Sequence, residues 1–290
     1  MPWYFFALAS ALLLTTLSLV EKRLLFRVHS MDYSAAVAFV NALCSLPLLF
    51  FVDLSKVDPY PVAFLAFATA LSVPAFLLTT KGVRHLEIST AEPFMALGPG
   101  ISALLAFIVL HEKLALHQTL GIVFAIAGMY VLETKPHISI FESFRLMFRS
   151  RYIKYILYAL LIYGVTSLVD RVILNRYDMD PIVYIIFAQI FIAFHFFIVS
   201  LMVGDGSAAI VRGISKARWL ILLTAVLMTL SRIMQATAIK MAPLGLALTV
   251  KRTSVLFITV IGGELFHEKN LLRKTIAALI IVAGSLLIVL

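Results

Sequence analysis

The chain has 290 residues, of which 62% are hydrophobic and 13% are charged, with a formal net charge of +9 and a mean hydropathy of +1.03. Soluble domains contain about 45 to 50% apolar and about 25% charged residues, so this composition excludes a soluble globular protein. A single cysteine, Cys44, excludes an intrachain disulfide and a cysteine-based metal site. We expect no metal, no cofactor and no nucleic-acid partner.

Ten apolar stretches, each of about the length that crosses a bilayer, follow one another along the chain. They cover residues 3–26, 33–52, 61–80, 88–110, 116–133, 152–174, 181–203, 217–240, 244–266 and 271–290. The first is not a cleavable signal, because no Lys or Arg precedes it and Glu21, Lys22 and Arg23 lie at its end. The sequence predicts an all-α, multi-pass protein of the cell membrane, either a plasma membrane or a bacterial inner membrane.

Each half of the chain carries five of these stretches, and the two halves repeat one another. The matches are Ser18–Lys22 with Ser167–Arg171, Met31-Asp32 with Met179-Asp180, Asn41 with Gln189, and His111–Lys113 with His267–Lys269. We therefore predict a first five-helix repeat at 1–134, a connecting surface segment at 135–151 and a second five-helix repeat at 152–290. An odd number of helices per repeat turns the second repeat upside down, which is the inverted-repeat plan of many secondary transporters.

Lys and Arg gather on one side of the predicted bundle. The loops that join stretches 1–2, 3–4, 5–6, 7–8 and 9–10 hold 16 of the 24, and the opposite side holds five. Under the positive-inside rule the first side is cytoplasmic and both termini face out. Two of its loops have apolar residues at helical spacing, Phe141 and Phe144 in 135–151 and Ile210 and Ile214 in the 7–8 loop. This spacing is typical of short surface helices, and ordinary loop charge is the alternative.

The ends of the two halves resemble a known family. Pro99–Leu110 leads into His111–Lys113 and a helix with Gly121 and Gly128, while Ser254–Phe266 leads into His267–Lys269 and a helix with Gly284. This apolar-Glu-Lys junction before a glycine-containing helix is similar to the EamA-type domain of the drug/metabolite transporter superfamily, in two copies. The resemblance implies a ten-helix permease, not an enzyme, with amino acids, metabolites, sugars or drugs held between its halves. It also implies cytoplasmic termini, whereas the count of Lys and Arg predicts external termini, and we follow the count.

We interpret the pairs His111-Glu112 and His267-Glu268 as loop anchors, since two such neighbouring residues do not make a metal site.

Three cations fall inside predicted helices, where an ionisable side chain costs at least ~2.5 to 3.5 kcal/mol and is rarely kept without use. Arg232 is the deepest, Lys251 and Arg252 reach a similar depth in the next helix, and Asp170 shares a helical stripe with Tyr163 near the same side. The surplus positive charge predicts an anionic or zwitterionic substrate that Arg232 and Arg252 bind, with Lys251 snorkelling or paired with Asp170. The alternative is a fixed ion-pair cluster that joins helices 6, 8 and 9.

Glu92 is the first candidate for a coupling proton, because it precedes a Gly98–Gly100 break in helix 4 and broken helices line transporter cavities. Glu21 is the second candidate, and we expect both carboxylates on the side opposite to the cations. The alternatives are a helix-end carboxylate that faces interfacial water for Glu92, and snorkelling or pairing with Lys22 for Glu21.

Asn41 and Gln189 occupy equivalent positions in helices 2 and 7 and are candidate substrate ligands. Hydrogen bonds between helices are the alternative use of such residues. His195, which lies among phenylalanines, is expected in the core, and no Walker motif supports ATP hydrolysis.

The combined interpretation is a secondary active transporter that moves a small organic anion, amino acid or related metabolite by alternating access, proton-coupled or by exchange. Two alternatives stay open. A flippase for a phosphate-bearing lipid head group would need a lateral opening to lipid, and an intramembrane acyltransferase-like enzyme would need a His-carboxylate pair inside a pocket. The expected partners are a small-molecule substrate and membrane lipids, and the sequence is compatible with a homodimer.

Overall fold

The computed structural model describes residues 2–52, 57–110, 115–133, 149–177, 179–203, 205–241 and 244–289, and these form helices joined by short connections without a β-strand. The first half contains α1 (Trp3–Leu25), α2 (Ser30–Ser45) with a 3-10 extension η1 (Leu46–Phe51), α3 (Pro59–His85), α4 (Ile88–Met95), α5 (Gly98–Leu110) and α6 (Leu116–Glu133). The second half contains α8 (Arg151–Asn175), α9 (Pro181–Met202), α10 (Ala208–Ala217), α11 (Trp219–Met241), α12 (Leu244–Phe257), the π-helical segment η3 (Ile258–Gly262), α13 (Gly263–Leu265) and α14 (Leu271–Val289).

Helix lies in each of the ten predicted stretches. By length and composition, six helices of the described chain are candidate membrane spans, and α10 with α11 would make a seventh. The six are Trp3–Leu25, Ser30–Phe50, Pro59–His85, Arg151–Asp170, Ile182–Met202 and Leu271–Val289. The protein is therefore a multi-pass integral membrane protein, as the composition predicts, while ten crossings in two inverted repeats stay a prediction.

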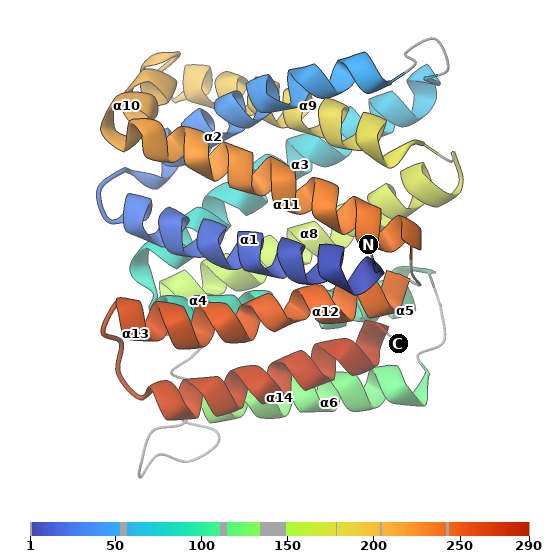
Figure 1. The fold of residues 1–290 in the computed structure, drawn as a ribbon, viewed down its shortest axis with the longest axis vertical. Helices are drawn as coiled ribbons and strands as arrows, with labels where there is room; N and C mark the ends of the chain where they lie inside the picture. The colour runs from blue at the N-terminus through green and yellow to red at the C-terminus, as the bar shows by residue number, and fades with distance from the viewer. Residues whose placement is uncertain are drawn as a thin grey trace.

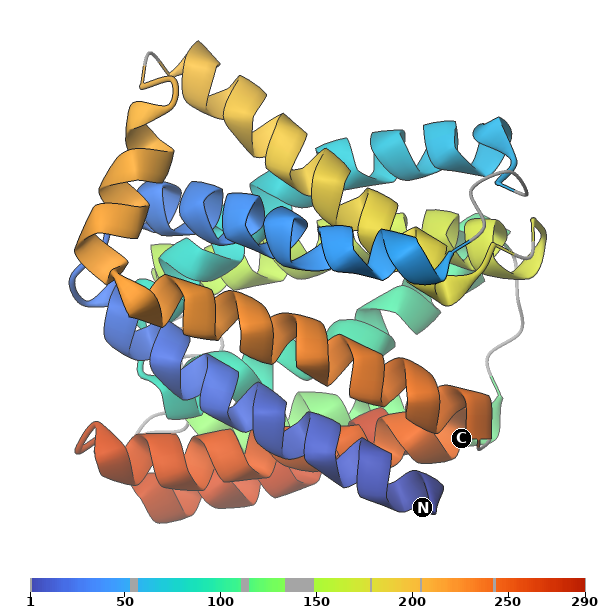
Figure 2. The same cartoon turned by 45° about the horizontal axis from the view of Figure 1, so that its top comes forward.

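Helices of the two halves pack against each other throughout the bundle. The pairs that run side by side are α1 with α11, α3 with α8, α2 with α9, and α6 with α14 (Figure 1). In the turned view α9 crosses over α2 (Figure 2). The largest buried cluster combines Tyr33 and Phe94 of the first half with Ile156 and Ile281 of the second. The core thus lies between the halves, where a transporter of this plan would also hold its substrate.

Small residues bring α6 and α14 into backbone contact. A Cβ added to Gly121 would lie 2.5 Å from the carbonyl oxygen of Gly284, and one added to Gly284 would lie 2.6 Å from that of Gly121. Glycine at both positions is what this close approach requires, as in other membrane helix pairs.

The fourth helix of the first half is broken, and that of the second half contains a π-helical segment near its end. In the first half the break lies at Ala96 and Leu97, between α4 and α5, immediately before the Gly98–Gly100 sequence that predicted it. In the second half α12 passes through the π-helical turns of η3 before α13, and α4 packs against η3. Interrupted helices free backbone groups that can serve a cavity, and π-helical turns often mark functional sites.

The 7–8 connection contains a short helix, α10, as predicted, while its position on the membrane surface stays a prediction. It meets α11 at a bend of 97°, and Arg218 at the corner has a φ of 55°.

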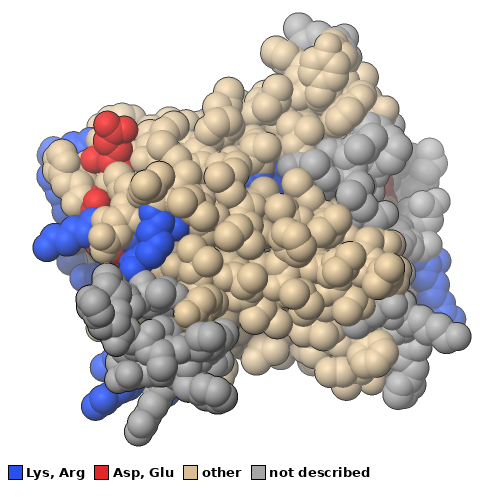
Figure 3. All heavy atoms as spheres, turned by 90° about the horizontal axis from the view of Figure 1, so that it is seen from below, with Lys and Arg blue, Asp and Glu red and all other residues tan. Residues whose placement is uncertain are grey.

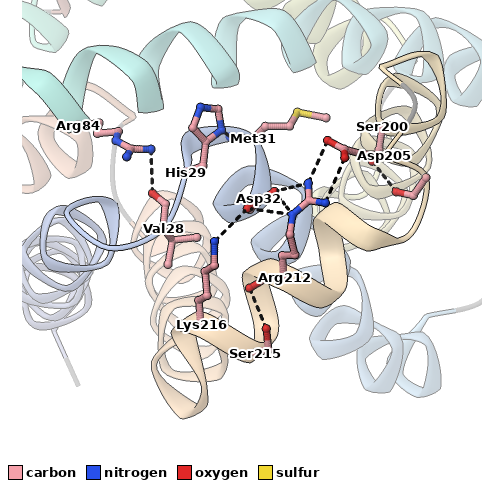
Figure 4. A network of polar contacts seen from close by, with 11 residues as sticks. Val28, His29, Met31, Asp32, Arg84, Ser200, Asp205, Arg212, Ser215 and Lys216 are labelled. Carbon is pink, nitrogen blue, oxygen red and sulfur yellow. Dashed lines mark hydrogen bonds and ion pairs between the residues drawn. The ribbon is translucent and has the colours of Figure 1, made fainter.

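Arg212 of α10 forms ion pairs with Asp32 at the start of α2, at 3.0 Å, and with Asp205, at 2.9 Å (Figure 4). The same guanidinium lowers the pKa of the Asp205 carboxyl below its usual value. The segment around Phe141 and Phe144 lies outside the described residues.

The two chain ends lie at the same end of the bundle, opposite to α10 and to the turn between α13 and α14 (Figure 1). A space-filling view shows Lys and Arg gathered towards the ends of the molecule, with other side chains covering most of the face between them (Figure 3). This distribution is that of a protein whose middle faces lipid and whose ends face water.

We predict that the end that carries α10 is cytoplasmic, because its loops contain 16 of the 24 Lys and Arg residues. A reporter fused after Leu290 should therefore give an external signal, and one inserted in the loop before α10 a cytoplasmic signal. The opposite pair of signals would contradict this orientation, and signals from the same side for both reporters would contradict the number of crossings between them.

Candidate functional site

Two adjoining cavities occupy the centre of the bundle. The first, here called the amide cavity, has a volume of about 380 Å³ and lies among α2, α3, α8, α9 and α11. The second, here called the charged cavity, has a volume of about 490 Å³ and extends to α1, α4 and α12. Residues that line both include Phe76, Tyr163 and Arg232. All nine predicted site residues line at least one of the two cavities. The amide cavity is lined by Asn41, Tyr163, Asp170, Gln189 and Arg232. The charged cavity is lined by Glu21, Glu92, Tyr163, Arg232, Lys251 and Arg252.

Arg232 stands where the two cavities meet. Within the described residues its guanidinium makes no hydrogen bond and no ion pair. The groups that act on it electrostatically are the hydroxyls of Tyr163 and Tyr184 and the ammonium of Lys251. An arginine cannot lose its proton at ordinary pH, so this charge needs either water or a ligand as its partner.

The pair between Lys251 and Asp170, one of the two alternatives for Lys251, is not formed. Lys251 lines the charged cavity, where its ammonium donates a short hydrogen bond to Oε1 of Gln235. Asp170 lines the amide cavity, where its carboxylate accepts a hydrogen bond from the Tyr184 hydroxyl. The two charges come from different helices that face different cavities, which spacing along one helix cannot reveal.

The carboxylates Glu21 and Glu92 lie on the same cavity as the three cations, not on the opposite side as we expected. Glu92 interacts with the Ser18 hydroxyl and with the charge of Arg252, and Glu21 lies close enough to Glu92 to repel it. The reason is the short α4, which ends at Met95 and brings Glu92 towards the helix that carries Arg252.

The two amides of the amide cavity differ in their partners. Asn41 accepts a hydrogen bond from Thr229 at 3.0 Å and donates one to the sulfur of Met228 at 3.1 Å, so it joins α2 to α11. Gln189 has an exposed fraction of only 2%, and neither its amide nitrogen nor its oxygen has a partner in the described part of the chain. A buried amide with both groups unpaired is costly unless a ligand or water completes it. Of the two amides, Gln189 is therefore the one whose hydrogen-bonding groups are not used by the described residues.

The second His-Glu-Lys junction anchors α4. The Glu268 carboxylate accepts hydrogen bonds from the backbone N–H groups of Ile88 at 2.6 Å and Ser89 at 3.1 Å. Buried Lys274 adds an ion pair to it at 3.4 Å. This confirms the loop-anchor interpretation for the second half, while His111–Lys113 lies outside the described residues.

At the same end of the bundle, the Lys22 ammonium donates to the carbonyl oxygens of Val83 at 2.7 Å and Leu86 at 2.5 Å, where α3 ends. Lys22 is thus a helix cap and not the partner of Glu21, because its ammonium is used at the end of a neighbouring helix. That leaves the Glu21 side chain to line the charged cavity.

Tyr184 is the polar residue of the site that sequence reasoning missed. Its hydroxyl meets Asp170, which lies on a different helix. The spacing of residues along α9 does not distinguish Tyr184 as a site residue.

His195, expected in the core, lies 3.5 Å from the Thr69 hydroxyl and lines neither central cavity.

These features define a helical membrane protein with a polar, charge-lined cavity enclosed between two halves, which is the build of a transporter. The family model of the EamA-like transporter family matches residues 1–134 and 150–290. The chain therefore belongs to the EamA-like transporter family, and it is a membrane transporter of small molecules, as the resemblance implies.

Other comparisons add the fold and a second family. The model of the magnesium transporter NIPA family matches residues 86–205. One solved crystal structure, described only as that of a protein, is 13% identical with a TM-score of 0.55, over 98% of this chain and 95% of that chain. No curated protein matches. The described residues contain no group of three or more His, Cys, Asp or Glu side chains that could hold a metal ion.

Proposed function

We propose that the protein is a secondary active transporter that moves a small zwitterion, such as an amino acid, through the two central cavities. The observation that carries the proposal is Arg232, a half-buried side chain whose guanidinium lines both cavities and has no ion-pair partner among the described residues. Its planar fork suits a carboxylate, with which it can form two parallel hydrogen bonds.

Charge balance favours a zwitterion over a simple anion. Three cations (Arg232, Lys251 and Arg252) and three carboxylates (Glu21, Glu92 and Asp170) line the two cavities. The surplus of positive charge that the sequence predicted is therefore cancelled once Glu21 and Glu92 are counted on the same cavity. A zwitterion keeps this balance, whereas an anion or a metal cation adds a charge that the low dielectric of the membrane penalises.

The position of the polar groups suggests how such a substrate is oriented. We place its carboxylate at Arg232. We place its ammonium in the amide cavity, where the Asp170 carboxylate and the unpaired Oε1 of Gln189 are hydrogen-bond acceptors. Asn41, Lys251 and Tyr163 complete the walls, and Arg252 lies beside Glu92.

Alternating access between two inverted repeats is the mechanism that we infer. The pattern of helix contacts supports it: if each helix of one repeat is exchanged for its equivalent in the other, the pair α1–α11 becomes α8–α3, and α2–α9 and α6–α14 map onto themselves. Any pseudo-two-fold axis between the repeats produces this arrangement, and an odd number of helices per repeat would place that axis in the membrane plane. The two stretches of the family match, 1–134 and 150–290, support the same division.

The other functions have less support. The acyltransferase alternative needs a histidine beside a carboxylate, and no histidine lines either central cavity in the described residues. Magnesium, the cargo in the name of the NIPA family, would meet three cations and only two carboxylates in the charged cavity. The lipid-flippase alternative differs from our proposal in the size of its cargo, so substrate screening distinguishes them.

We predict that Arg232→Ala weakens substrate affinity by about 1.5 to 3 kcal/mol, the worth of a hydrogen bond to a charged group. Arg232→Lys should recover part of this loss, because lysine keeps the positive charge but lacks the planar guanidinium that donates two parallel hydrogen bonds. The measurement is a titration of purified protein with the amino acid that gives the largest thermal stabilisation in a screen. Arg23→Ala, which removes an equal charge from an exposed end position, is the matched control. Equal affinity in Arg232→Ala and the control would contradict the proposal.

We also predict that Glu92 carries the coupling proton. Glu92→Gln should abolish uphill accumulation driven by a proton gradient in proteoliposomes and keep exchange of labelled for unlabelled substrate, because glutamine has the same shape but cannot carry the proton. Glu264→Gln, at an exposed acidic position, should transport like the wild type. Uphill transport at the wild-type rate in Glu92→Gln would remove Glu92 from the coupling mechanism.

A further inference from the structure

We propose that a third polar cavity, at the end that carries α10, binds the phosphate group of a ligand on that side of the membrane. The cavity, here called the basic cavity, has a volume of about 310 Å³. It lies between the α1–α2 turn, the last turn of α3 and the first turn of α8, and it shares no lining residue with the two central cavities. It is therefore separate from both central cavities.

Cations from two helices converge on this cavity and are held in place by other contacts. Lys81 and Arg84 come from α3 and Arg151 from α8. Nη1 of Arg84 donates to the carbonyl oxygen of Val28 at 3.1 Å (Figure 4), and Nη2 of Arg151 donates to the Tyr155 hydroxyl at 3.2 Å. Each of these hydrogen bonds uses one nitrogen, and no other hydrogen bond of either guanidinium is formed with a described residue. The remaining N–H groups can donate to a ligand.

An aromatic wall fixes the shape of the cavity. The His85 ring stacks on the Tyr152 ring with centroids 4.3 Å apart and planes at 18°. The Arg151 guanidinium lies over the same tyrosine, 5.5 Å from its centroid. Ordered arginine and histidine side chains lose less entropy on binding than free ones, so this wall favours a specific site over diffuse attraction.

No acidic residue lines the basic cavity among the described residues. Asp32, which lies on the other side of the α1–α2 turn, is already bound to Arg212 and Lys216 of α10 (Figure 4). Within the described residues, the positive charge of Lys81, Arg84 and Arg151 is therefore not neutralised by a carboxylate. The helices α2 and α8 also begin at the cavity, with Ser30 and Arg151 in its wall, and helix N-termini favour anions.

The positive-inside rule alone accounts for the number of these charges but not for their arrangement. Arg23 and Arg27 are exposed cations of the same end, as Lys81 and Arg151 are, but they line none of the three cavities, whereas Lys81, Arg84 and Arg151 line one cavity with an aromatic wall. Arginine and lysine together with hydroxyls are the groups that recognise phosphate. The phosphate can belong to an anionic lipid of the adjacent leaflet or to a soluble phosphate compound, and the experiment separates these sources.

The experiment measures binding to purified, detergent-solubilised protein by thermal shift at low salt. The probes are short-chain phosphatidic acid, inorganic phosphate, and short-chain phosphatidylcholine as the zwitterionic reference. The double variant Lys81→Gln/Arg151→Gln removes two charges from the basic cavity, and Arg23→Gln/Arg27→Gln removes two exposed charges from the same end. We expect phosphatidic acid to bind the first variant at least tenfold more weakly than wild type, and the second within twofold of wild type.

Binding of phosphatidic acid without inorganic phosphate would identify a lipid head group as the ligand, and binding of both would identify the phosphate group itself. Equal weakening in the two double variants would show a diffuse charge effect and overturn the proposal. Wild-type affinity in Lys81→Gln/Arg151→Gln, or no binding of either phosphate probe to the wild type, would overturn it too. Melting temperatures without ligand, equal to that of the wild type, establish that the variants are folded.

Discussion

The constraint on which the structure depends is the presence of a guanidinium at the centre of a membrane bundle. A charge at that depth costs at least ~2.5 to 3.5 kcal/mol, and Arg232 has no ion partner in the described chain to offset the cost. The bundle instead surrounds it with two polar cavities that together balance three cations with three carboxylates. Removal of one member of such a set leaves another charge uncompensated, so the set acts as a unit.

The cavities are held open by helix ends fixed outside them. Glu268 binds the start of α4 and Lys22 binds the end of α3, both through backbone groups that the helices themselves leave unpaired. These anchors determine where the short α4 begins, and thereby place Glu92 beside Arg252. The facing glycines of α6 and α14 hold the two halves together at another edge of the bundle. The charged cavity is thus framed by contacts that do not themselves use its charges.

The sequence predicted what depends on composition and spacing along one helix. The helical bundle, the break in helix 4, α10 and the identity of the cavity-lining residues follow from hydropathy, glycine and proline positions and buried charge. It could not predict pairs across helices. The failed pair of Lys251 with Asp170, the placement of Glu21 and Glu92, and the partnership of Tyr184 with Asp170 all depend on how helices rotate against each other. Matched residues of the two repeats also have different partners, since Asp32 binds Arg212 while its counterpart Asp180 caps α9 at 2.7 Å.

The central claim, that the cavities hold a zwitterion with its carboxylate at Arg232, is tested most directly by binding of matched ligands to the wild-type protein. Each amino acid of a panel is compared, by thermal shift, with the acid that lacks its amino group and the amine that lacks its carboxylate. The account predicts one or more amino acids that stabilise the protein, by about 2.7 kcal/mol at 100 times the dissociation constant, and much weaker stabilisation by both of their analogues. An amine that stabilises the protein as strongly as its parent amino acid would contradict the account.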